Sequence, residues 1–369
     1  MAARMWLGEG VNPYDPSVAV AAQQVIYGRP ANAEDGENLG LLLYPLWVMI
    51  FYVPLSIAPY PLALAIWMTM LEIGLPLLVW LAVRLNRWRA SPRLLIVMIV
   101  FFILSYHGMR AIFSGQIAVF ESLLVVGGLL AIQREKDVAG GILLAVSLVK
   151  PHLSAFLLLF VILWSISMRR WRLLISLILS PLLLLGLCLL LSRDWMLMWL
   201  RSLVALAQSV DVRPPIIILG WKFGAAAFWT GLGLIVALGI FMIVEWFRAL
   251  GNGDNWFQWT AALTLVTTCM LTLRTTSANM VLLIPAVVLV LKVWLDRKKS
   301  GGRISAFLGG LIVFAALWLL YIMTAGELAE SPYLFLPVPL LAFIGLLWSR
   351  WWITGGPGVL VHSDALSWD

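Results

Sequence analysis

The chain has 369 residues, of which 62% are hydrophobic and 12% are charged, and its mean hydropathy is +0.98. Because about a quarter of the residues of a soluble globular domain are charged, this composition excludes that class and indicates a polytopic membrane protein. The formal net charge is +7. This charge does not indicate a nucleic-acid partner, because the basic residues are dispersed in short loops between apolar segments.

Residues 1–58 form a region of mixed polarity before the first long apolar segment. Within this region, the segment 41–57 is apolar but is interrupted by Pro45 and Pro54. Each proline removes a backbone donor, and lipid-exposed chain cannot leave backbone groups unpaired. We therefore predict an outer loop over 1–58 that contains a juxtamembrane or re-entrant helix at 41–57.

Residues 59–353 consist of apolar segments that approach the length needed to cross a bilayer, about 20 residues. We count eleven, near 60–83, 93–108, 117–133, 138–149, 153–168, 172–192, 222–247, 256–273, 277–295, 304–325 and 332–353. The segment 138–149 is short and is consistent with a partly inserted helix. The sequence thus predicts an all-α bundle of about 11 transmembrane helices and a cytoplasmic tail at 354–369, within one integral-membrane domain over 1–369.

Between two of these segments, residues 193–214 begin with Arg193 and Asp194 and end with Arg213 and Pro214. Within this stretch an apolar pattern recurs at helical spacing, at Trp195, Met198, Trp199, Leu203 and Leu206. A helix with tryptophan on its apolar face is typical of the membrane interface, and we expect such a helix here.

Basic residues in short loops mark the cytoplasmic side of a membrane protein. They gather in alternate loops of this chain: Arg84, Arg87, Arg89 and Arg93; Arg134 and Lys136; Arg169, Arg170 and Arg172; Arg248; Arg297, Lys298, Lys299 and Arg303; and Arg350. This alternation predicts a cytoplasmic carboxyl terminus. It also predicts that the remaining loops and the amino-terminal region face outward.

Lys150-Pro151-His152 interrupts an apolar stretch that otherwise runs from Val138 to Met168. Ionisable groups at such positions are costly and usually functional. A second polar cluster, at 106–116, contains His107, Arg110 and Gln116 and lies in another loop that we expect to face outward. Cations and amides gathered at an outer interface suit a phosphate or pyrophosphate carried by a lipid, and a carboxylate in an adjacent loop would act as a base on a hydroxyl.

The candidate binding residues are accordingly Gln116, Lys150, His152, His107, Arg110 and Arg274, and the candidate carboxylates are Asp15 and Asp35. Isolated basic residues at membrane edges also extend towards lipid headgroups, which is the alternative for Arg110, Lys222 and Lys150. Glu72 lies alone in an apolar segment and suits hydrogen bonding or packing better than a proton relay, whereas Glu121 follows Gln116 closely enough to lie near the site. Three scattered histidines and no metal or phosphate-loop motif predict no metal site and no cofactor, although assistance by a divalent cation stays open.

The chain resembles glycosyltransferase family 87, a bacterial family of polytopic, mannosyltransferase-like proteins. The resemblance covers the first 200 or so residues, after which the chain is similar only to a generic series of spans. Its order of motifs is more specific than any one of them. Four motifs carry the resemblance, in this order: an alanine-containing helix and a Gly-x-Asn-Pro-Tyr-Asp loop at 2–16, a helix with Tyr-Pro and the following span at 43–67, the sequence Ser-Gly-Gln at 114–116, and a passage that begins at residue 140, includes Lys150-Pro151 and ends with the basic residues of 169–172.

The resemblance implies a GT-C architecture and transfer of a hexose such as mannose from a polyprenyl-phosphate donor to an extracytoplasmic lipid, glycan or protein acceptor. It implies a place in the inner membrane of a bacterium, and contacts of Gln116 and Lys150 with the donor phosphate or sugar, assisted by His152 and Arg274. The family carries an aspartate and a first span before the alanine-rich helix, and this chain begins within that helix. We therefore expect the first span and the usual aspartate to be missing, either because the start of the chain was assigned too late or because the protein has lost its base. In the second case Asp15 or Asp35 would have to act as the base.

Two other functions stay open at this point. A transporter or flippase of lipid-linked or small polar substrates also places polar groups between apolar helices, but transporters often show two repeated halves with binding near the mid-membrane. Here the polar groups lie at one face, and no convincing internal repeat is evident. The other alternative is an inactive scaffold that lacks the catalytic aspartate.

Overall fold

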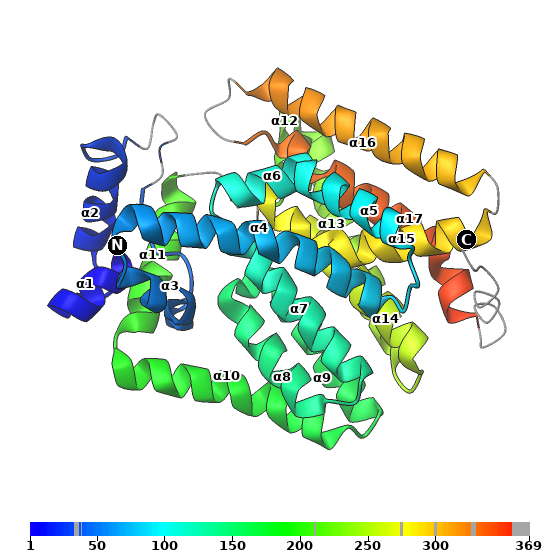
Figure 1. The fold of residues 1–369 in the computed structure, drawn as a ribbon, viewed down its shortest axis with the longest axis horizontal. Helices are drawn as coiled ribbons and strands as arrows, with labels where there is room; N and C mark the ends of the chain where they lie inside the picture. Colours follow the sequence, from blue (N-terminus) through cyan, green and yellow to red (C-terminus); the bar gives the residue numbers. More distant parts are fainter. Residues whose placement is uncertain are drawn as a thin grey trace.

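The computed structural model describes residues 1–32, 37, 39–209, 212–273, 276–298, 301–325 and 330–355. Within these ranges every regular element is helical, which confirms the predicted all-α class (Figure 1). Asp35, Arg274 and the tail beyond residue 355, for which the sequence made predictions, lie outside the described residues.

Each of the eleven predicted segments contains helix, but the number of helices suited to cross a membrane is smaller. Among the residues that the structure describes, six helices are long and apolar enough to cross a membrane, and a bent pair makes up to seven. The six are α4 (Tyr60–Leu85), α10 (Trp171–Leu191), α13 (Ala225–Ala249), Ser277–Arg297 with α15 (Ile284–Arg297), α16 (Gly302–Thr324), and Pro332–Thr354 with α17 (Pro337–Thr354). The chain is therefore a polytopic membrane protein, and the predicted number of about 11 spans was too high.

Helix length explains most of this difference. Three of the predicted spans form the shorter helices α7 (Ala118–Gln133), α8 (Asp137–Val146) and α9 (Pro151–Ser167), with 16, 10 and 17 residues. At about 1.5 Å per residue none of them reaches the ~30 Å of a hydrocarbon core. A fourth, α14 (Asp254–Leu271), is long but carries several threonines and is almost wholly buried by protein.

The predicted span at 93–108 is broken. Helices α5 (Pro92–Leu104) and α6 (Tyr106–Phe113) meet at Ser105 with a bend of 61°. The Ser105 hydroxyl caps α6 by accepting from the Gly108 amide, and a Cβ at Gly108 would lie only 1.9 Å from the Phe102 carbonyl oxygen. Local capping and a close backbone approach thus override the apolar continuity of the segment.

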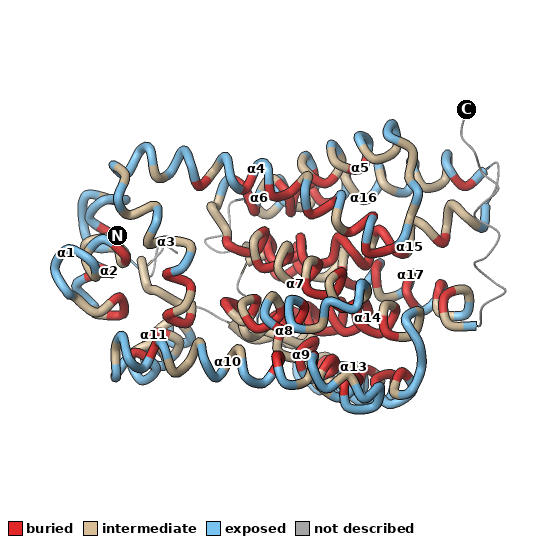
Figure 2. The backbone as a smooth tube through the Cα atoms, turned by 60° about the horizontal axis from the view of Figure 1, so that its bottom comes forward, coloured by how far each residue is buried: buried red, intermediate tan, exposed pale blue. Residues whose placement is uncertain are grey.

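The centre of the bundle is formed by α4, α7, α9, α14 and the 3-10 turn η4 (Ser277–Leu283), where buried backbone is concentrated (Figure 2). Helices α10 and α16 lie at opposite edges of the ribbon (Figure 1). Only 6% of the apolar window of α16 is buried, and that of α13 is 11% buried. Such helices suit contact with lipid, which accepts apolar side chains that the protein leaves uncovered.

The amino-terminal region forms α1 (Ala2–Glu9), α2 (Pro16–Tyr27), the turn η2 (Leu46–Val48) and α3 (Met49–Ser56). The predicted helix at 41–57 is thus present as η2 and α3. Helix α11 (Trp195–Ser209) forms within the predicted stretch 193–214 and packs on this region through Trp195, which is 1% exposed. The tryptophan therefore has a protein partner; whether α11 lies in the membrane interface stays a prediction.

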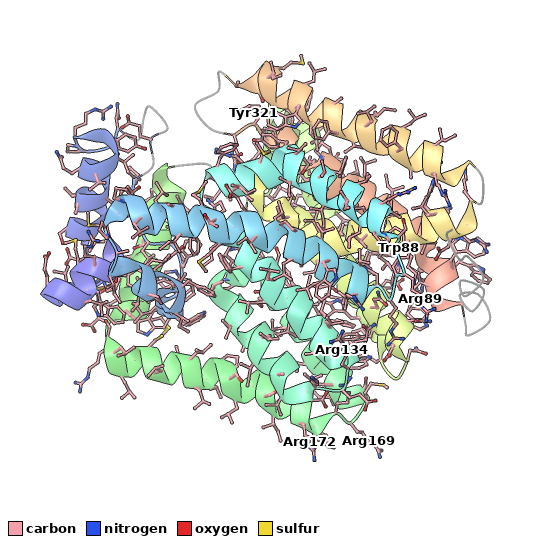
Figure 3. The ribbon with its side chains drawn as sticks, in the orientation of Figure 1. Trp88, Arg89, Arg134, Arg169, Arg172 and Tyr321 are labelled. Atoms are coloured by element: carbon pink, nitrogen blue, oxygen red, sulfur yellow. The ribbon has the colours of Figure 1, made fainter. Side chains whose placement is uncertain are left out.

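The arginine-rich loops come together at one end of the bundle. Arg89, Arg134, Arg169 and Arg172 gather there (Figure 3). Arg87 pairs with Asp254 at 2.6 Å, and Arg170 pairs with Asp137, so loops far apart in sequence are joined. This grouping agrees with the alternation of charge along the chain.

Remaining elements of the described chain are the turn η3 (Ser147–Val149) between α8 and α9, helix α12 (Pro215–Lys222) before α13, and the turn η5 (Pro332–Phe335) before α17.

Candidate functional site

Lys150 is buried between η3 and α9, with 3% of its surface exposed. Pro151 begins α9, because its fixed φ suits the first helical position and its missing N–H is not needed there. The Lys150 Nζ donates to the Asn279 Oδ1 at 2.7 Å and to the Gln116 Oε1 at 3.1 Å. The cation that interrupts the apolar run is therefore held by two neutral amides from other parts of the chain.

Tyr44 completes the group around this cation. Its ring centroid lies 5.6 Å from the Lys150 Nζ, which is within the range of a cation–π interaction. Its hydroxyl donates to the Gln116 Oε1 at 3.4 Å, and its carbonyl accepts from the Tyr14 hydroxyl at 2.6 Å. We call Tyr44, Gln116, Lys150 and Asn279 the Lys150 cluster.

The turn that presents Gln116 is fixed by its neighbours. Gly115 has φ +61°, a left-handed conformation that favours glycine. The Trp67 indole donates to the Gly115 carbonyl at 2.9 Å, and the Gln116 amide donates to the Ala111 carbonyl at 3.0 Å. The Ser-Gly-Gln motif thus forms a rigid turn between α6 and α7 that aims the Gln116 side chain at Lys150.

Two more ionisable groups lie beside the cluster. Glu121 on the first turn of α7 is 0% exposed, and its carboxylate oxygens have no hydrogen-bond partner among the described residues. His152 follows Lys150 on α9, and the His152 Nε2 is buried without a partner in the described part of the chain. Buried polar atoms without a partner are uncommon and call for an explanation.

Arg110 belongs to a separate network around Glu330. The Glu330 Oε1 accepts from the Arg110 Nε at 2.7 Å, from the Tyr106 hydroxyl at 2.9 Å and from the Ser277 hydroxyl at 2.7 Å, while its Oε2 accepts from the Ser277 amide at 2.8 Å. Burial raises the pKa of Glu330, but the bonds from Ser277 and the charge of Arg110 outweigh it and hold the pKa below its ordinary value. His107 is buried beside Tyr106.

The structure thus brings together Gln116, Lys150 and His152 among the predicted site residues. Arg110 and His107 lie in the Glu330 network, which adjoins the Lys150 cluster through η4, the element that carries both Ser277 and Asn279. Their roles in binding stay predictions.

The predicted carboxylate Asp15 has a local structural use. It is the N-cap of α2, and its Oδ1 accepts from the Ser17 amide at 2.9 Å and from the Ser17 hydroxyl at 2.7 Å. These two bonds hold the pKa of Asp15 below its ordinary value. A role as a base stays a prediction for this residue.

Sequence reasoning missed Asn279 and Glu330 and did not assign Tyr44 a contact with the cation. Asn279 carries a signal that could have been used, because it is the amide that opens the apolar segment 277–295. Glu330 carries no comparable signal, since its partners Tyr106 and Arg110 are more than 200 residues away.

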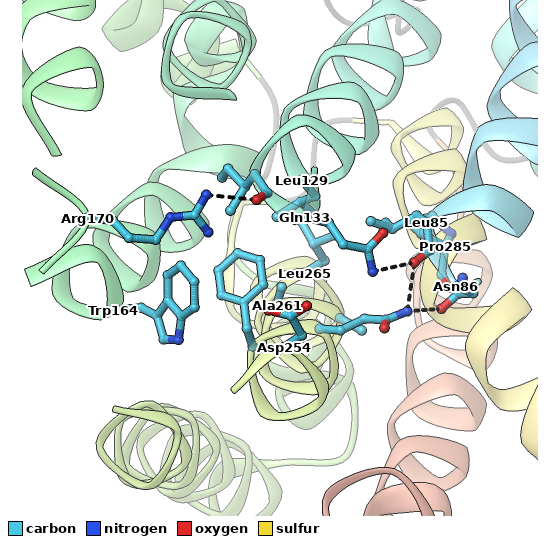
Figure 4. A pocket seen from close by; sticks show the side chains of 14 residues that line it. Leu85, Asn86, Leu129, Gln133, Trp164, Arg170, Asp254, Ala261, Leu265 and Pro285 are labelled. Carbon is cyan, nitrogen blue, oxygen red and sulfur yellow. Dashed lines mark hydrogen bonds between the residues drawn. The ribbon is translucent and has the colours of Figure 1, made fainter. Parts of the chain in front are cut away.

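Two hollows lie at different ends of the bundle. One borders Asn279 and is lined also by Leu153, Cys269, Thr272, Thr276 and Met280. The other lies at the arginine-rich end and is lined by Asn86, Gln133, Trp164, Arg170 and Gln258 among others (Figure 4). No group of three or more histidine, cysteine or acidic side chains placed to hold a metal ion occurs among the residues that the structure describes.

The chemistry available at the Lys150 cluster is that of an anion site. An ammonium group has three donors, and two of the three are used by Gln116 and Asn279. The remaining donor and the positive charge suit an oxyanion in a low-dielectric setting, where a charge-assisted hydrogen bond is strong.

Comparison with known proteins gives a consistent result. The comparisons with curated proteins and with solved structures gave no match. The model of glycosyltransferase family 87 matches residues 42–272, which is more than half of the chain and includes Tyr44, Gln116 and Lys150. The chain belongs to glycosyltransferase family 87, and it is a membrane glycosyltransferase.

Proposed function

We propose that this glycosyltransferase moves a hexose such as mannose from a polyprenyl-phosphate donor to an extracytoplasmic lipid, glycan or protein acceptor. The observation that carries the proposal is the buried Lys150, which two amides hold at the start of α9, the opposite end of that helix from Arg169. A lone cation in an apolar run is costly unless it has an anion to bind, and a lipid phosphate at the membrane edge is such an anion.

In the proposed reaction, an acceptor hydroxyl attacks the anomeric carbon of the sugar. The bond between that carbon and the phosphate oxygen breaks, the electron pair leaves with the polyprenyl phosphate, and the hydroxyl proton passes to a carboxylate. Lys150 stabilises the charge that develops on the phosphate, as fixed donors do for other leaving groups. Gln116 and Asn279 hold the Lys150 Nζ in place, while Asp15 and Asp35 are the candidate bases, of which Asp15 also caps α2.

We further propose that the Lys150 cluster faces outward in the inner membrane of a bacterium and that the carboxyl terminus is cytoplasmic. The gathering of Arg89, Arg134, Arg169 and Arg172 at the opposite end supports this orientation, because arginine in short loops marks the cytoplasmic side. A GT-C-type bundle, formed as a single domain over 1–369, is the architecture that this proposal implies.

The test is transfer of labelled mannose from polyprenyl-phosphate-mannose in membranes that contain the full chain. Lys150→Ala and Gln116→Ala are expected to lose transfer, and Lys136→Ala, at an exposed loop lysine, is the matched control that keeps it. Absence of transfer from every donor tried, or equal transfer by Lys150→Ala and the control, would refute the proposal.

The break between α5 and α6 favours one second candidate, transport of lipid-linked or small polar substrates. Discontinuous helices line the substrate sites of many transporters, and the 61° bend at Ser105 places α6 next to the Glu330 network. Uptake into proteoliposomes that depends on an ion gradient, without mannose transfer, would select this function. Neither transfer nor uptake would select an inactive scaffold.

A further inference from the structure

The amino-terminal region, the end of α10 and α11 share a small hydrophobic core, apart from the main core of the bundle. Its buried members are Ala3, Tyr14, Leu46, Met49, Cys188 and Trp195. Helices α1, α2, α3 and α11 accordingly lie together at one end of the molecule (Figures 1 and 2). The proposed reaction uses Asp15 from the Gly-x-Asn-Pro-Tyr-Asp loop but gives no role to the rest of that loop or to α11, so both need an explanation.

Leu43 and Tyr44 link this region to the Lys150 cluster. They precede η2 and belong to no helix, so their backbone carbonyls need partners from elsewhere in the chain. The Trp199 indole on α11 donates to the Leu43 carbonyl at 3.0 Å, and the Tyr14 hydroxyl donates to the Tyr44 carbonyl at 2.6 Å. Two side chains from different parts of the chain therefore hold two consecutive residues in place.

The loop that carries Tyr14 is anchored in turn. The Asn12 Oδ1 accepts from the Tyr14 amide at 3.0 Å, and the Asn12 Nδ2 donates to the hydroxyl of Ser192, the residue after α10, at 2.9 Å. Tyr14 itself is 7% exposed, because its ring packs in the small core. Buried polar groups that are fully bonded rigidify their surroundings. The Tyr14 hydroxyl is thus presented to Tyr44 from a fixed point.

Tyr44 carries this fixed geometry to the cation. Its ring centroid lies 5.6 Å from the Lys150 Nζ, close to the limit of about 6 Å for a cation–π interaction. Its hydroxyl donates to the Gln116 Oε1 at 3.4 Å, the atom that also accepts from the Lys150 Nζ. Because the ring contact is near its limit, a small shift of the backbone at Leu43 and Tyr44 would break it. The bonds to the two carbonyls are placed where they prevent such a shift.

We propose that Tyr14 and Trp199 are positioning residues that keep the Tyr44 ring over Lys150, so that the ring closes one side of the ammonium group and the anion binds from another side. The Gly-x-Asn-Pro-Tyr-Asp loop and α11 then serve one purpose, which is to fix the surroundings of the cation. The part that Lys150 plays in binding a donor phosphate rests on the proposed function, whereas the placement of the Tyr44 ring does not.

A double-mutant cycle with Tyr44 separates positioning from a purely structural role. Tyr14→Phe removes one hydroxyl and keeps the ring in the small core, and it is expected to lower mannose transfer per folded molecule by about fivefold, the ratio for the ~1 kcal/mol of one hydrogen bond. In a Tyr44→Leu background the backbone carbonyl remains but there is no ring to position. Tyr14→Phe is expected there to lower the melting temperature as before and to leave the residual transfer unchanged. An equal fall in transfer in both backgrounds, or no fall in either, overturns the proposal.

Trp199→Phe makes the same test through the other bond and serves also if Tyr14→Phe does not fold. It removes the indole N–H and keeps an aromatic ring on α11, so the same pattern in the two backgrounds is expected. The matched control is Tyr60→Phe, which removes a hydroxyl from a tyrosine that begins α4 and is 53% exposed. It is expected to transfer and to melt as the wild type does. If Tyr60→Phe reproduces the fall seen for Tyr14→Phe, the loss is unspecific and the proposal fails.

Chemical labelling of Lys150 tests the placement of the ring without any substrate. Acetic anhydride acetylates amines, and mass spectrometry of the full chain after labelling in detergent and digestion gives the rate at Lys150, with the exposed Lys136 as internal standard. Lys150 is expected to react faster in Tyr44→Leu than in the wild type and at an intermediate rate in Tyr14→Phe and Trp199→Phe, because the side that the ring covers becomes accessible. Equal rates in the wild type and in these two variants overturn the proposal. If the wild type transfers no mannose, the proposed function is refuted, while the labelling rates still decide the placement of the Tyr44 ring.

Discussion

Two buried polar groups at opposite ends of the bundle differ in how completely they are satisfied. At the arginine-rich end, Asn86 donates to the Ala82 and Pro285 carbonyls at 2.7 and 3.1 Å. Its side-chain oxygen accepts from Gln258 at 2.7 Å, and its carbonyl accepts from the Lys292 Nζ at 2.9 Å. Gln133 adds a bond to the Leu85 carbonyl (Figure 4). We call Asn86, Gln133, Gln258 and Lys292 the Asn86 cluster.

The Lys150 cluster is built from the same kinds of side chain, but next to it both carboxylate oxygens of Glu121 and the Nε2 of His152 lack partners in the described chain, whereas beside the Asn86 cluster one oxygen of Asp296, near Lys292, does so. Buried polar groups that are fully bonded rigidify a fold, and groups that are left unbonded mark sites that await a ligand or store strain. The two clusters have similar residue types, so composition does not tell a structural cluster from a binding site. The number of buried polar atoms left without a partner is the better indicator.

The largest expected effect comes from removing the cation. Lys150→Met is expected to lower transfer by about 100-fold or more, the loss seen when one fixed donor to a developing charge is removed. The free energy of unfolding is expected to change by only about 2 kcal/mol, because removal of a buried charge offsets the loss of its two hydrogen bonds to Gln116 and Asn279. Steady-state transfer and thermal unfolding on the same preparation measure both. Collapse of the fold in Lys150→Met would show that this cluster, too, is structural.

Asn86→Leu is the mirror experiment at the other end. It removes the side-chain bond to the Pro285 carbonyl and one of the two bonds of the Gln258 Nε2, which keeps the Leu85 carbonyl as a partner. The substitution is expected to lower the free energy of unfolding by about 2 kcal/mol, within the ~1–3 kcal/mol that a lost partner costs a buried group. Transfer per folded molecule is expected to stay within about twofold, because the Asn86 cluster holds no group of the reaction. A selective loss of transfer with normal stability would contradict the comparison.

How far sequence reasoning reached can be seen from the same two ends. The alternation of charge anticipated that Arg89, Arg134 and Arg169 would gather, because the rule depends only on which loops carry arginine. The same alternation also predicted that the loops carrying Gln116 and Lys150 lie on the same side of the membrane. All eleven apolar segments do contain helix, because periodic apolar sequence between polar loops has few alternatives in a bilayer.

What sequence reasoning could not reach depends on tertiary contacts. Asn279 meets Lys150 across 129 positions of sequence, and no local pattern encodes such a pairing. The break at Ser105 depends on a cap and on the approach of Gly108 to the Phe102 carbonyl, both invisible in hydropathy. The number of spans was overestimated because an apolar segment such as 118–133 can be buried in protein without crossing the membrane.

The Glu330 network is intermediate between the Asn86 cluster and the Lys150 cluster. It contains an ionised group, as the Lys150 cluster does, but the Glu330 carboxylate is fully hydrogen-bonded, as the amides of the Asn86 cluster are. Glu330→Gln is expected to lower the free energy of unfolding at neutral pH by about 2 kcal/mol, the scale of hydrogen bonds to a charged group. Because the pKa of Glu330 is depressed, its contribution is present above the ordinary carboxyl pKa of about 4.3 and is lost as the pH falls through the folded-state pKa. The difference between wild type and variant should therefore vanish in acid, as measured by unfolding over a pH series. A difference that grows in acid would reverse the sign and contradict the assignment.

The smallest expected effect concerns Asp15, whose side chain is satisfied locally by Ser17 as the amides of the Asn86 cluster are by their partners. Asp15→Ala is expected to lower the melting temperature slightly through loss of the α2 cap, and Asp15→Ser is expected to restore it, because serine caps a helix about as well as aspartate. Serine cannot act as a carboxylate base, so transfer by Asp15→Ser separates the two roles. Wild-type transfer would leave Asp35 as the candidate base and Asp15 as a helix cap alone. A fall of about 100-fold, on the scale of a lost general base, with restored stability would instead assign the base to Asp15 and place α2 at the reacting sugar.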